Sequence, residues 1–512
     1  MKQQQVAVRL DNITKTFGRT VANNKVTLEI NRGEILALLG ENGSGKTTLM
    51  NMLSGIYFPD EGQIYVNGQE VKITSPKVAF DLGIGMVHQH FKLVDVLTAA
   101  ENIILGLDDG KRLNLDEVSK KVLQLCDDYG FEIDPKHKIY NMSVSQKQTV
   151  EIVKVLYRGA EILILDEPTA VLTPQETEKL FAVLRNMRAS GKAIVIITHK
   201  MHEVLSVSDR VAVLRKGEYI GEVPTAEASR QSLTDMMVGR SVLLNIDRPM
   251  CEDCKPRIEV RNLSVTTEDG VSKLKDISFT INSGEILGIA GISGSGQKEL
   301  LESIAGLQKI DGGEIVFHND DGTTVHMEGK DPLTVAQMGL SLAFVPEDRL
   351  GMGLVGNMGL SENMLLRSYR EGNSALVQRK PARKLAETVV KDLEVMTPSI
   401  ETPVRRLSGG NVQKVLVGRE ISLAPKVLLT AYAVRGLDIN SSYTIYDLLN
   451  KQKQNGVAVV YVGEDLDVLL ELSDRILVLC DGQVSGIVDG RGAEKNQIGL
   501  MMTHVGGENQ NG

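Results

Sequence analysis

An eight-residue stretch near the start of the chain, GENGSGKT (40–47), has the residue types and spacing of a phosphate-binding loop. It fits G-x-x-x-x-G-K-[ST] and lies between EILALL, which predicts a strand, and TTLMNML, which predicts a helix. Glycines here let backbone N–H groups surround phosphate oxygens, and a chance glycine turn would lack the flanking elements. We expect Lys46 to reach the β- and γ-phosphates and the Thr47 hydroxyl to bind Mg²⁺. The other phosphate-binding residues of the loop would be Gly40, Asn42, Gly43, Ser44, Gly45 and Thr48.

Two adjacent carboxylates follow a second apolar segment, ILIL (162–165). Asp166 would help to hold the Mg²⁺ ion, and Glu167 would accept a proton from an attacking water molecule. A positioned general base of this kind contributes about 10²–10⁴-fold in rate. The competing interpretation is that one of these carboxylates caps the N-terminus of a helix.

Three further side chains have types that suit the same chemistry. Gln89 in GMVHQH and His199 in VIITH each follow an apolar segment. Gln89 could bridge water and metal, and His199 could contact the γ-phosphate, although a single histidine is more often structural. Phe17 in ITKTFG could stack on adenine, but an ordinary buried aromatic residue fits its spacing equally well.

The sequence contains one long internal repeat. The segment 26–56 is similar to 276–307, and 207–221 is similar to 472–486. Each copy has about 250 residues, which is within the range of a single domain. The expected organisation is a first domain at 1–242, a short linker at 243–256, a second domain at 257–505 and a disordered tail at 506–512.

Both copies alternate short apolar segments with helical stretches such as 114–129. This order predicts an α/β fold with a parallel sheet, in which ligands bind at the carboxyl ends of the strands. Asp166, Glu167, Gln89 and His199 all follow predicted strands, so we expect them at one edge of the sheet.

The composition limits the possible partners and the location. The 512 residues carry a net charge of −9, which argues against non-specific binding to nucleic acid. No apolar run approaches the roughly 20 residues needed to span a bilayer, and the N-terminus lacks the apolar core of a signal peptide. We therefore expect a cytoplasmic protein that contacts a membrane only through a partner. Cys251 and Cys254 form a C-x-x-C without a second pair nearby, which favours reduced thiols in a linker over a metal or redox site.

Together these motifs resemble the nucleotide-binding domains of ABC transporters. GENGSGKT resembles Walker A, ILILDEPTA resembles Walker B, Gln89 the Q-loop residue and His199 the switch histidine, and LSGGN (407–411) resembles the signature motif. The resemblance covers nearly the whole chain twice. It implies two tandem P-loop NTPase domains, each with a parallel-sheet core, an antiparallel β subdomain and a helical subdomain, and it implies ATP and Mg²⁺ as ligands.

Two such domains joined by a short linker, with the second degenerate, are similar to the ATPases of bacterial sugar-class importers. VPEDR (345–349) fits that class, and the segment 87–103 is closer to its nucleoside-uptake branch. The resemblance implies an ATPase bound to two integral-membrane permease subunits at the cytoplasmic face, supplied by an extracytoplasmic substrate-binding protein. The cargo would be a nucleoside or, alternatively, a simple sugar such as ribose, galactose or xylose. More distant alternatives are a soluble ABC ATPase acting on ribosomes, a kinase or GTPase, and a module that binds nucleotide without hydrolysing it.

In this family the two domains pair head to tail, so that each ATP lies between Walker A of one copy and the signature of the other. The intact first Walker motifs would then face the signature of the second copy, in which Ser408, Gly409 and Gly410 approach the γ-phosphate. The signature of the first copy, NMSVSQ, has Ser145 where a glycine is expected and would face the second Walker motifs.

The second Walker motifs have lost most of their chemistry. Gln297 and Lys298 stand in place of Lys46 and Thr47, and Ala431 and Tyr432 stand in place of the two carboxylates; the remaining changes are Glu347 for Gln89, Glu464 for His199 and Thr267 near the Phe17 position. Carboxylates at two of these positions would repel a triphosphate. The sequence therefore predicts one hydrolytic site and one degenerate site.

Overall fold

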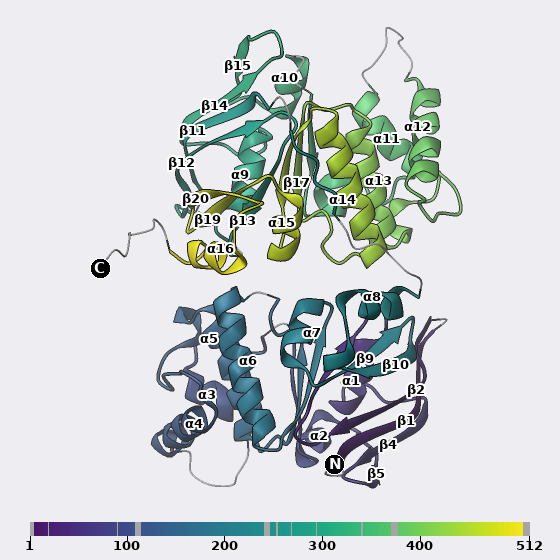
Figure 1. Cartoon of the computed structure of the whole chain (residues 1–512), viewed down its shortest axis with the longest axis vertical. Helices are drawn as coiled ribbons and strands as arrows, with labels where there is room; N and C mark the ends of the chain where they lie inside the picture. The colour runs from purple at the N-terminus through teal and green to yellow at the C-terminus, as the bar shows by residue number, and fades with distance from the viewer. Residues whose placement is uncertain are drawn as a thin grey trace. The chain divides into compact units, whose positions relative to one another are not determined.

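The computed structural model describes the chain except for residues 1–4, 19, 90, 108–113, 171, 240–245, 252–253, 268, 293, 339–340, 370–376 and 505–512. The tail expected to be disordered, 506–512, lies outside the described residues. The chain divides into two compact units, unit 1 (Met1–Leu243) and unit 2 (Leu244–Gly512). Each unit contains a four-stranded and a six-stranded sheet with helices packed against them (Figure 1).

The six-stranded sheet of unit 1 is parallel except for one edge strand. In spatial order its strands are β10 (Glu218–Pro224), β9 (Arg210–Arg215), β3 (Ile35–Leu39), β8 (Ala193–Thr198), β7 (Ile162–Asp166) and β6 (Ile84–Val87). Only β10 runs antiparallel to its neighbour. The second sheet is antiparallel, in the order β2 (Thr20–Asn31), β1 (Val6–Phe17), β4 (Glu61–Val66) and β5 (Gln69–Val71).

The helices of unit 1 cover both faces of its parallel sheet. They are α1 (Lys46–Leu53), α2 (Pro76–Asp81), α3 (Ala99–Ile104), α4 (Leu115–Tyr129), α5 (Val144–Tyr157), α6 (Pro174–Ala189), α7 (Met201–Val207) and α8 (Arg230–Val238), with 3-10 turns at Ile139–Asn141 and Thr225–Glu227. Helix α1 shares one apolar cluster with both sheets, whereas α3 to α6 pack together on the opposite face of the parallel sheet.

Strand β7 shows why the apolar segments before the predicted site residues are continuous rather than alternating. Ile162 and Ile164 lie in the cluster that contains α1, whereas Leu163 and Leu165 lie in the cluster that contains α3 to α6. A parallel strand covered on both faces buries every residue, so it carries no polar alternation. Its first polar residue, Asp166, therefore marks the carboxyl end of the strand.

Unit 2 repeats the same two sheets. The six-stranded sheet has the order β16 (Leu342–Val345), β17 (Val427–Ala431), β18 (Ala458–Val462), β13 (Ile286–Ala290), β19 (Arg475–Cys480) and β20 (Gln483–Asp489). The four-stranded sheet has the order β12 (Ser272–Asn282), β11 (Pro256–Thr266), β14 (Gly312–His318) and β15 (Thr324–His326). This duplicated arrangement confirms the predicted α/β class with two tandem P-loop domains.

The helices of unit 2 follow the order of unit 1. They are α9 (Gln297–Ile304), α10 (Pro332–Gln337), α11 (Leu360–Ser368), α12 (Arg379–Asp392), α13 (Gly409–Ile421), α14 (Ile439–Gln454), α15 (Leu466–Leu472) and α16 (Lys495–Met501), with a π-helical turn at Arg349–Gly353 and a 3-10 turn at Val404–Arg406. Figure 1 shows α9 between the two sheets of this unit, and its apolar residues share a cluster with both.

The second copy contains a longer hairpin than the first. Strands β14 and β15 pair antiparallel, with His318 opposite Thr324. The loop between them is longer than the equivalent turn in unit 1, where Val66 pairs with Gln69. Asp320 in this loop pairs with Lys426 and Arg257, whose hydrogen bonds lower the pKa of that carboxyl to about 2.

The segment expected as a linker is held against unit 2 where it is described. Arg248 donates to the carbonyl oxygens of Leu470 and Ser473. Cys251 and Cys254 form a disulfide, so the prediction of reduced thiols was wrong. Their Cα atoms lie 5.8 Å apart, which is within the span of a disulfide bond, and spacing alone did not reveal this.

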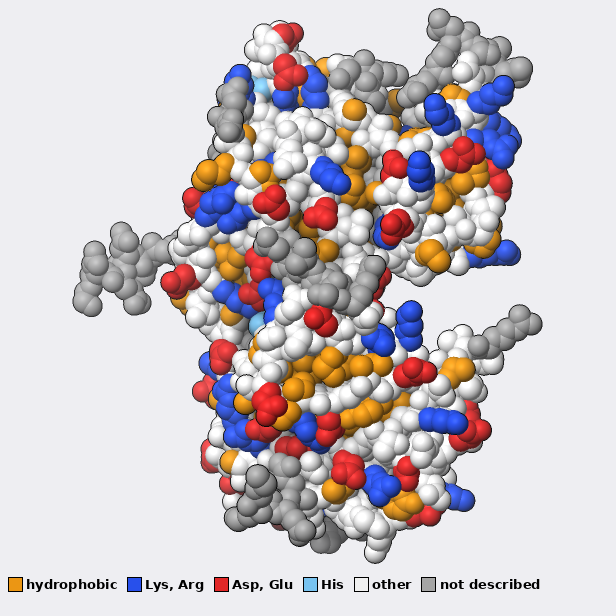
Figure 2. Space-filling view, turned by 45° about the vertical axis from the view of Figure 1, so that its right-hand side comes forward, with side chains coloured by type: hydrophobic (Ala, Val, Ile, Leu, Met, Phe, Trp, Pro, Cys, Tyr) orange, Lys and Arg blue, Asp and Glu red, His pale blue; other side chains and the backbone are white. Residues whose placement is uncertain are grey.

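Acidic and basic side chains are interspersed on the face shown in Figure 2. Within the described residues, no helix combines the length and apolar character required to cross a membrane.

Candidate functional site

The phosphate loop of unit 1 connects β3 to α1, as the sequence predicted. Helix α1 begins at Lys46, directly after Gly45, whose φ of 95° is in the left-handed region. A Cβ at Gly45 would lie 2.3 Å from the Ala22 carbonyl oxygen, and one at Gly40 would lie 2.3 Å from that of Leu214. Close backbone approach therefore requires glycine at both positions.

The groups of this loop are suited to an anion. The Lys46 ammonium donates to the carbonyl oxygens of Gly40 and Glu41 at 2.7 and 2.9 Å. Burial lowers the pKa of Lys46, and the nearby carboxylates of Glu167 and Asp166 partly offset this effect. The Ser44 hydroxyl is buried without a hydrogen-bond partner, and the space beside Gly43 is open. A buried cation and an unsatisfied hydroxyl beside open space fit a phosphate group.

Asp166 and Thr47 meet at the start of α1. The Thr47 hydroxyl lies 3.4 Å from a carboxylate oxygen of Asp166, at the end of β7. Burial raises the pKa of Asp166, an effect that the Thr47 hydroxyl opposes. A hydroxyl and a carboxylate oxygen are hard ligands of the kind that Mg²⁺ prefers, so these residues fit the ion.

Glu167 is held between two of the other predicted residues. One carboxylate oxygen accepts from the Gln89 amide at 3.1 Å, and the other lies 2.9 Å from Nδ1 of His199. The backbone of Glu167 has a φ of 47°, which is uncommon for a residue with a side chain. The hydrogen bond to His199 lowers the pKa of Glu167 and keeps it ionised. An ionised carboxylate with both oxygens fixed in place is suited to general-base chemistry.

Phe17 is not a buried aromatic residue, which removes the competing interpretation of its role. It ends β1 with 43% of its surface exposed, and its ring meets the edge of Tyr57 at 5.2 Å between centroids. Its ring is therefore accessible to a planar ligand.

The two signature segments begin α5 and α13 in the same way. Ser143 caps α5 and Ser408 caps α13, each through its hydroxyl. Asn411 donates its side-chain amide to Ser408 at 2.8 Å. The equivalence of the two helices shows that Val144 replaces the first signature glycine, a change that the sequence analysis overlooked beside Ser145.

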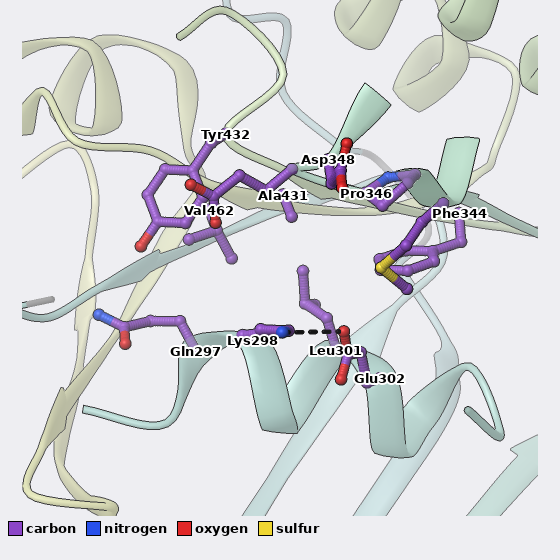
Figure 3. Close-up of a pocket in the computed structure, with 12 residues that line it drawn as sticks. Gln297, Lys298, Leu301, Glu302, Phe344, Pro346, Asp348, Ala431, Tyr432 and Val462 are labelled. Carbon is purple, nitrogen blue, oxygen red and sulfur yellow. Dashed lines mark ion pairs between the residues drawn. The ribbon is translucent and has the colours of Figure 1, made fainter. Parts of the chain in front are cut away.

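In the equivalent loop of unit 2, Gly296 has a left-handed φ of 101° before α9, as Gly45 has before α1, but the lysine is lost. Gln297 takes the place of Lys46 and donates to the Ile292 carbonyl oxygen at 3.0 Å. Lys298 is directed along α9 toward Glu302, 3.9 Å away, and does not substitute for the missing lysine (Figure 3).

The sequence analysis missed one residue at the second site. Arg435 pairs with Glu347 and, at 2.9 Å, with Glu464, the two carboxylates that replace Gln89 and His199. The expected repulsion is therefore offset within unit 2. The repeat aligns Arg435 with Ala170 of the first copy. A new positive charge three residues after the lost carboxylates was a sequence signal that could have indicated its role.

A comparison with protein families matches the model described as ABC transporter to residues 23–170 and 274–430. The chain belongs to the ABC transporter family. The two matches begin at equivalent positions of the repeat, and they include both phosphate loops.

Similar proteins align along nearly the whole chain. The nucleoside import ATP-binding protein NupA of Lactococcus lactis is 41% identical, covering 98% of this chain and 99% of that protein. The glucose import ATP-binding protein TsgD13 of Haloferax volcanii is 40% identical, and the alignment covers 98% of this chain and 96% of that protein. The guanosine import ATP-binding protein NupO of Bacillus subtilis is 39% identical, with 97% of both covered. The chain is thus an ABC-type ATPase that binds ATP.

Proposed function

We propose that this protein is the ATP-hydrolysing subunit of an importer and that the imported molecule is a nucleoside. The observation that carries the hydrolytic role is the fixed, ionised Glu167 beside the buried Lys46 of the phosphate loop. The protein would act at the cytoplasmic face of the membrane, bound to two integral-membrane permease subunits. An extracytoplasmic substrate-binding protein would deliver the cargo, and nucleic acid would not be a partner.

In the proposed mechanism, unit 1 supplies the groups that act on ATP. The backbone of Gly40 to Thr48 and the Lys46 ammonium bind the phosphates, and Phe17 stacks on the adenine ring. Thr47, Asp166 and Gln89 would hold Mg²⁺, which neutralises charge on the phosphates when it is bound. Glu167 accepts the proton of the attacking water, and His199 fixes the carboxylate and contacts the γ-phosphate.

The proposal includes reciprocal pairing of the two units in the working transporter. Ser408, Gly409 and Gly410 would complete the site of unit 1, because their small side chains permit close approach to the γ-phosphate. Val144 and Ser145 would then face the phosphate loop of unit 2, which already lacks its lysine and both carboxylates. In this pairing the altered signature of unit 1 meets the altered Walker motifs of unit 2, and the intact Walker motifs of unit 1 meet the intact signature of unit 2. This match supports the reciprocal pairing.

The nucleoside assignment is supported by two named relatives and by the segment 87–103. The protein from Haloferax volcanii, named for glucose import, is nearly as similar and supports a simple sugar as the second candidate.

Transport by reconstituted components would test this proposal. The chain would be assembled with its neighbouring permeases and binding protein in vesicles, and uptake of radiolabelled nucleosides and of ribose, galactose, xylose and glucose would be measured with and without ATP. ATP-dependent uptake of nucleosides supports the proposal. Uptake of a sugar alone would replace the cargo assignment, and absence of ATP hydrolysis would reject the enzymatic role.

A further inference from the structure

We propose that a cavity within unit 2 binds a small uncharged aromatic heterocycle, of the nucleobase or nucleoside class, and does not bind a nucleoside triphosphate. The cavity has a volume of about 300 Å³ and lies at the carboxyl ends of β16, β17 and β18, beside α9. Figure 3 shows its lining: Leu301 approaches from α9, and Ala431, Tyr432 and Val462 lie on the opposite side. The identification of this ligand with the imported class rests on the proposed function, whereas the cavity itself does not.

The charges around the cavity do not suit a triphosphate. Glu302, Glu347 and Asp348 all line it, and Lys298 is the single basic side chain in the described lining. Lys298 is directed toward Glu302 rather than toward the loop. Unit 1 offers a buried lysine to a triphosphate, whereas Lys298, the basic side chain in the described lining of this cavity, is paired with a carboxylate.

Ion pairs within unit 2 hold the side of the cavity near Glu347. Arg435 bridges Glu347 and Glu464, and its guanidinium lies 5.9 Å from the centre of the Tyr432 ring. In unit 1 a central carboxylate is flanked by an amide and an imidazole, whereas in unit 2 a central guanidinium is flanked by two carboxylates. The second arrangement is complete within unit 2, so this wall of the cavity is formed before a ligand binds.

The rest of the lining suits a flat molecule with N–H groups. Leu301, Phe344, Met352 and Val462 supply apolar surface, and Phe344 and Tyr432 contribute aromatic rings to the lining. Glu302 is largely buried, with 13% of its side chain exposed, and its described ion-pair partner is 3.9 Å away. Ring N–H groups could donate to this carboxylate. An apolar cavity with a few polar groups is typical of small-molecule sites.

A bound metal ion is a weaker explanation of the same carboxylates. Among the described residues, no group of three or more His, Cys, Asp or Glu side chains is arranged to hold a metal. Asp348 already accepts from the backbone N–H groups of Leu350 and Gly351, and Glu347 is paired with Arg435. These acidic groups are therefore committed to partners in the protein.

Isothermal titration calorimetry on the full chain would test the inference. Adenosine, guanosine and uridine would be titrated in the presence of saturating Mg-ATP, with ribose as a separate titrant. We expect one nucleoside to bind per chain without displacement by ATP. No heat from any nucleoside, binding of ribose alone, or displacement of the nucleoside by ATP would overturn the inference.

Two kinds of variant would place the ligand in this cavity. Ala431→Leu fills the cavity from β17 and should weaken nucleoside binding at least about tenfold. Leu301→Ala removes a lining contact and should also weaken binding, whereas Leu300→Ala, at a fully buried neighbour on the same helix that does not line the cavity, should leave it unchanged. Thermal melting would verify that each variant is folded. Unchanged affinity in Ala431→Leu, or equal losses in the two leucine variants, would overturn the assignment.

Cargo measured in the transport assay separates this inference from the proposed function. If the transporter carries a sugar but the cavity binds a nucleoside, the proposed cargo is wrong and the cavity assignment stands. If the transporter carries nucleosides but the cavity binds none, the proposed cargo stands and the cavity assignment is wrong.

Discussion

Nδ1 of His199 lies 2.9 Å from a carboxylate oxygen of Glu167, and this contact fixes the orientation of the proposed general base. Gln89 holds the other oxygen, so neither can rotate freely. In unit 2, Arg435 lies between Glu347 and Glu464, the residues at the positions of Gln89 and His199. In both units these polar side chains are paired with one another. Among the described residues, only unit 1 has a carboxylate beside an anion-binding loop that could accept a proton.

Glu167→Gln should abolish turnover while ATP still binds. The amide keeps the shape of the side chain but cannot accept a proton, which should lower the rate by about 10²–10⁴-fold. Phosphate release by the assembled transporter would measure turnover, and trapping of labelled ATP would measure binding.

Glu161→Gln provides a matched control for this change. Glu161 precedes the same strand, and its half-exposed side chain pairs with Lys192 and Arg32. The same chemical substitution there should leave turnover within about twofold of wild type, because Glu161 lies at the end of β7 opposite to Asp166 and Glu167. Similar losses in both variants would show that the effect does not depend on the proposed base.

The stability that ionised Glu167 confers should depend on pH. Its hydrogen bond to His199 holds the pKa of Glu167 below the ordinary value of 4.5. The unfolded chain then binds more protons between the two pKa values, so this stability is full above pH 4.5 and is lost as pH falls through the lower native pKa. The difference in thermal midpoint between wild type and Glu167→Gln should therefore change below pH 4.5 in favour of the variant. The same comparison in a His199→Gln background should show a smaller change, and an equal change would contradict the assigned cause.

Much of the unit 1 site could be predicted from the sequence because its residues sit at element boundaries. Continuous apolar runs marked buried parallel strands, and the first polar residue after each run, such as Asp166, lies at the same sheet edge. The loop GENGSGKT could be placed from its glycines, since Gly40 and Gly45 leave no room for a side chain. Patterns within a short stretch of sequence were sufficient to place a residue where a strand end or a glycine turn determined its position.

Other features depended on contacts between segments that are distant in the chain. Arg435 is 88 residues from Glu347, and no spacing rule connects them. The replacement of a glycine by Val144 becomes plain only from the shared starts of α5 and α13, which align Val144 with Gly409. The disulfide between Cys251 and Cys254 was missed because the C-x-x-C spacing is compatible with either redox state.

Exchanging serine and glycine between the signatures should have unequal effects. Ser145→Gly should change turnover by less than about twofold, because Val144 remains beside it and the site it is proposed to face lacks catalytic groups. Gly410→Ser should lower turnover by at least about tenfold, since a side chain would intrude between α13 and the γ-phosphate. Rates and KM for ATP in the assembled transporter would rank the two variants, and the reverse ranking would reject reciprocal pairing.

Crowding inside unit 2 could also contribute to the Gly410→Ser effect, and a second variant separates it. A Cβ at Gly410 would lie 3.1 Å from the Ser441 hydroxyl and 3.3 Å from a carboxylate oxygen of Asp438. Gly410→Ser combined with Ser441→Ala relieves the nearer contact. Persistent loss of turnover in this double variant is expected, and full recovery would assign the defect to local packing instead.

Arg435→Ala should destabilise unit 2 only modestly. Both ion pairs are about half exposed, and such pairs typically contribute about 0–1 kcal/mol each. A double-mutant cycle with Glu464→Gln, measured by denaturant unfolding, should give a coupling energy within that range. Arg383→Ala and Glu401→Gln form a control cycle at another exposed pair of unit 2. A coupling energy for Arg435 well above about 1 kcal/mol, with the control cycle inside that range, would contradict the prediction, because the bridge would then be stronger than an exposed ion pair.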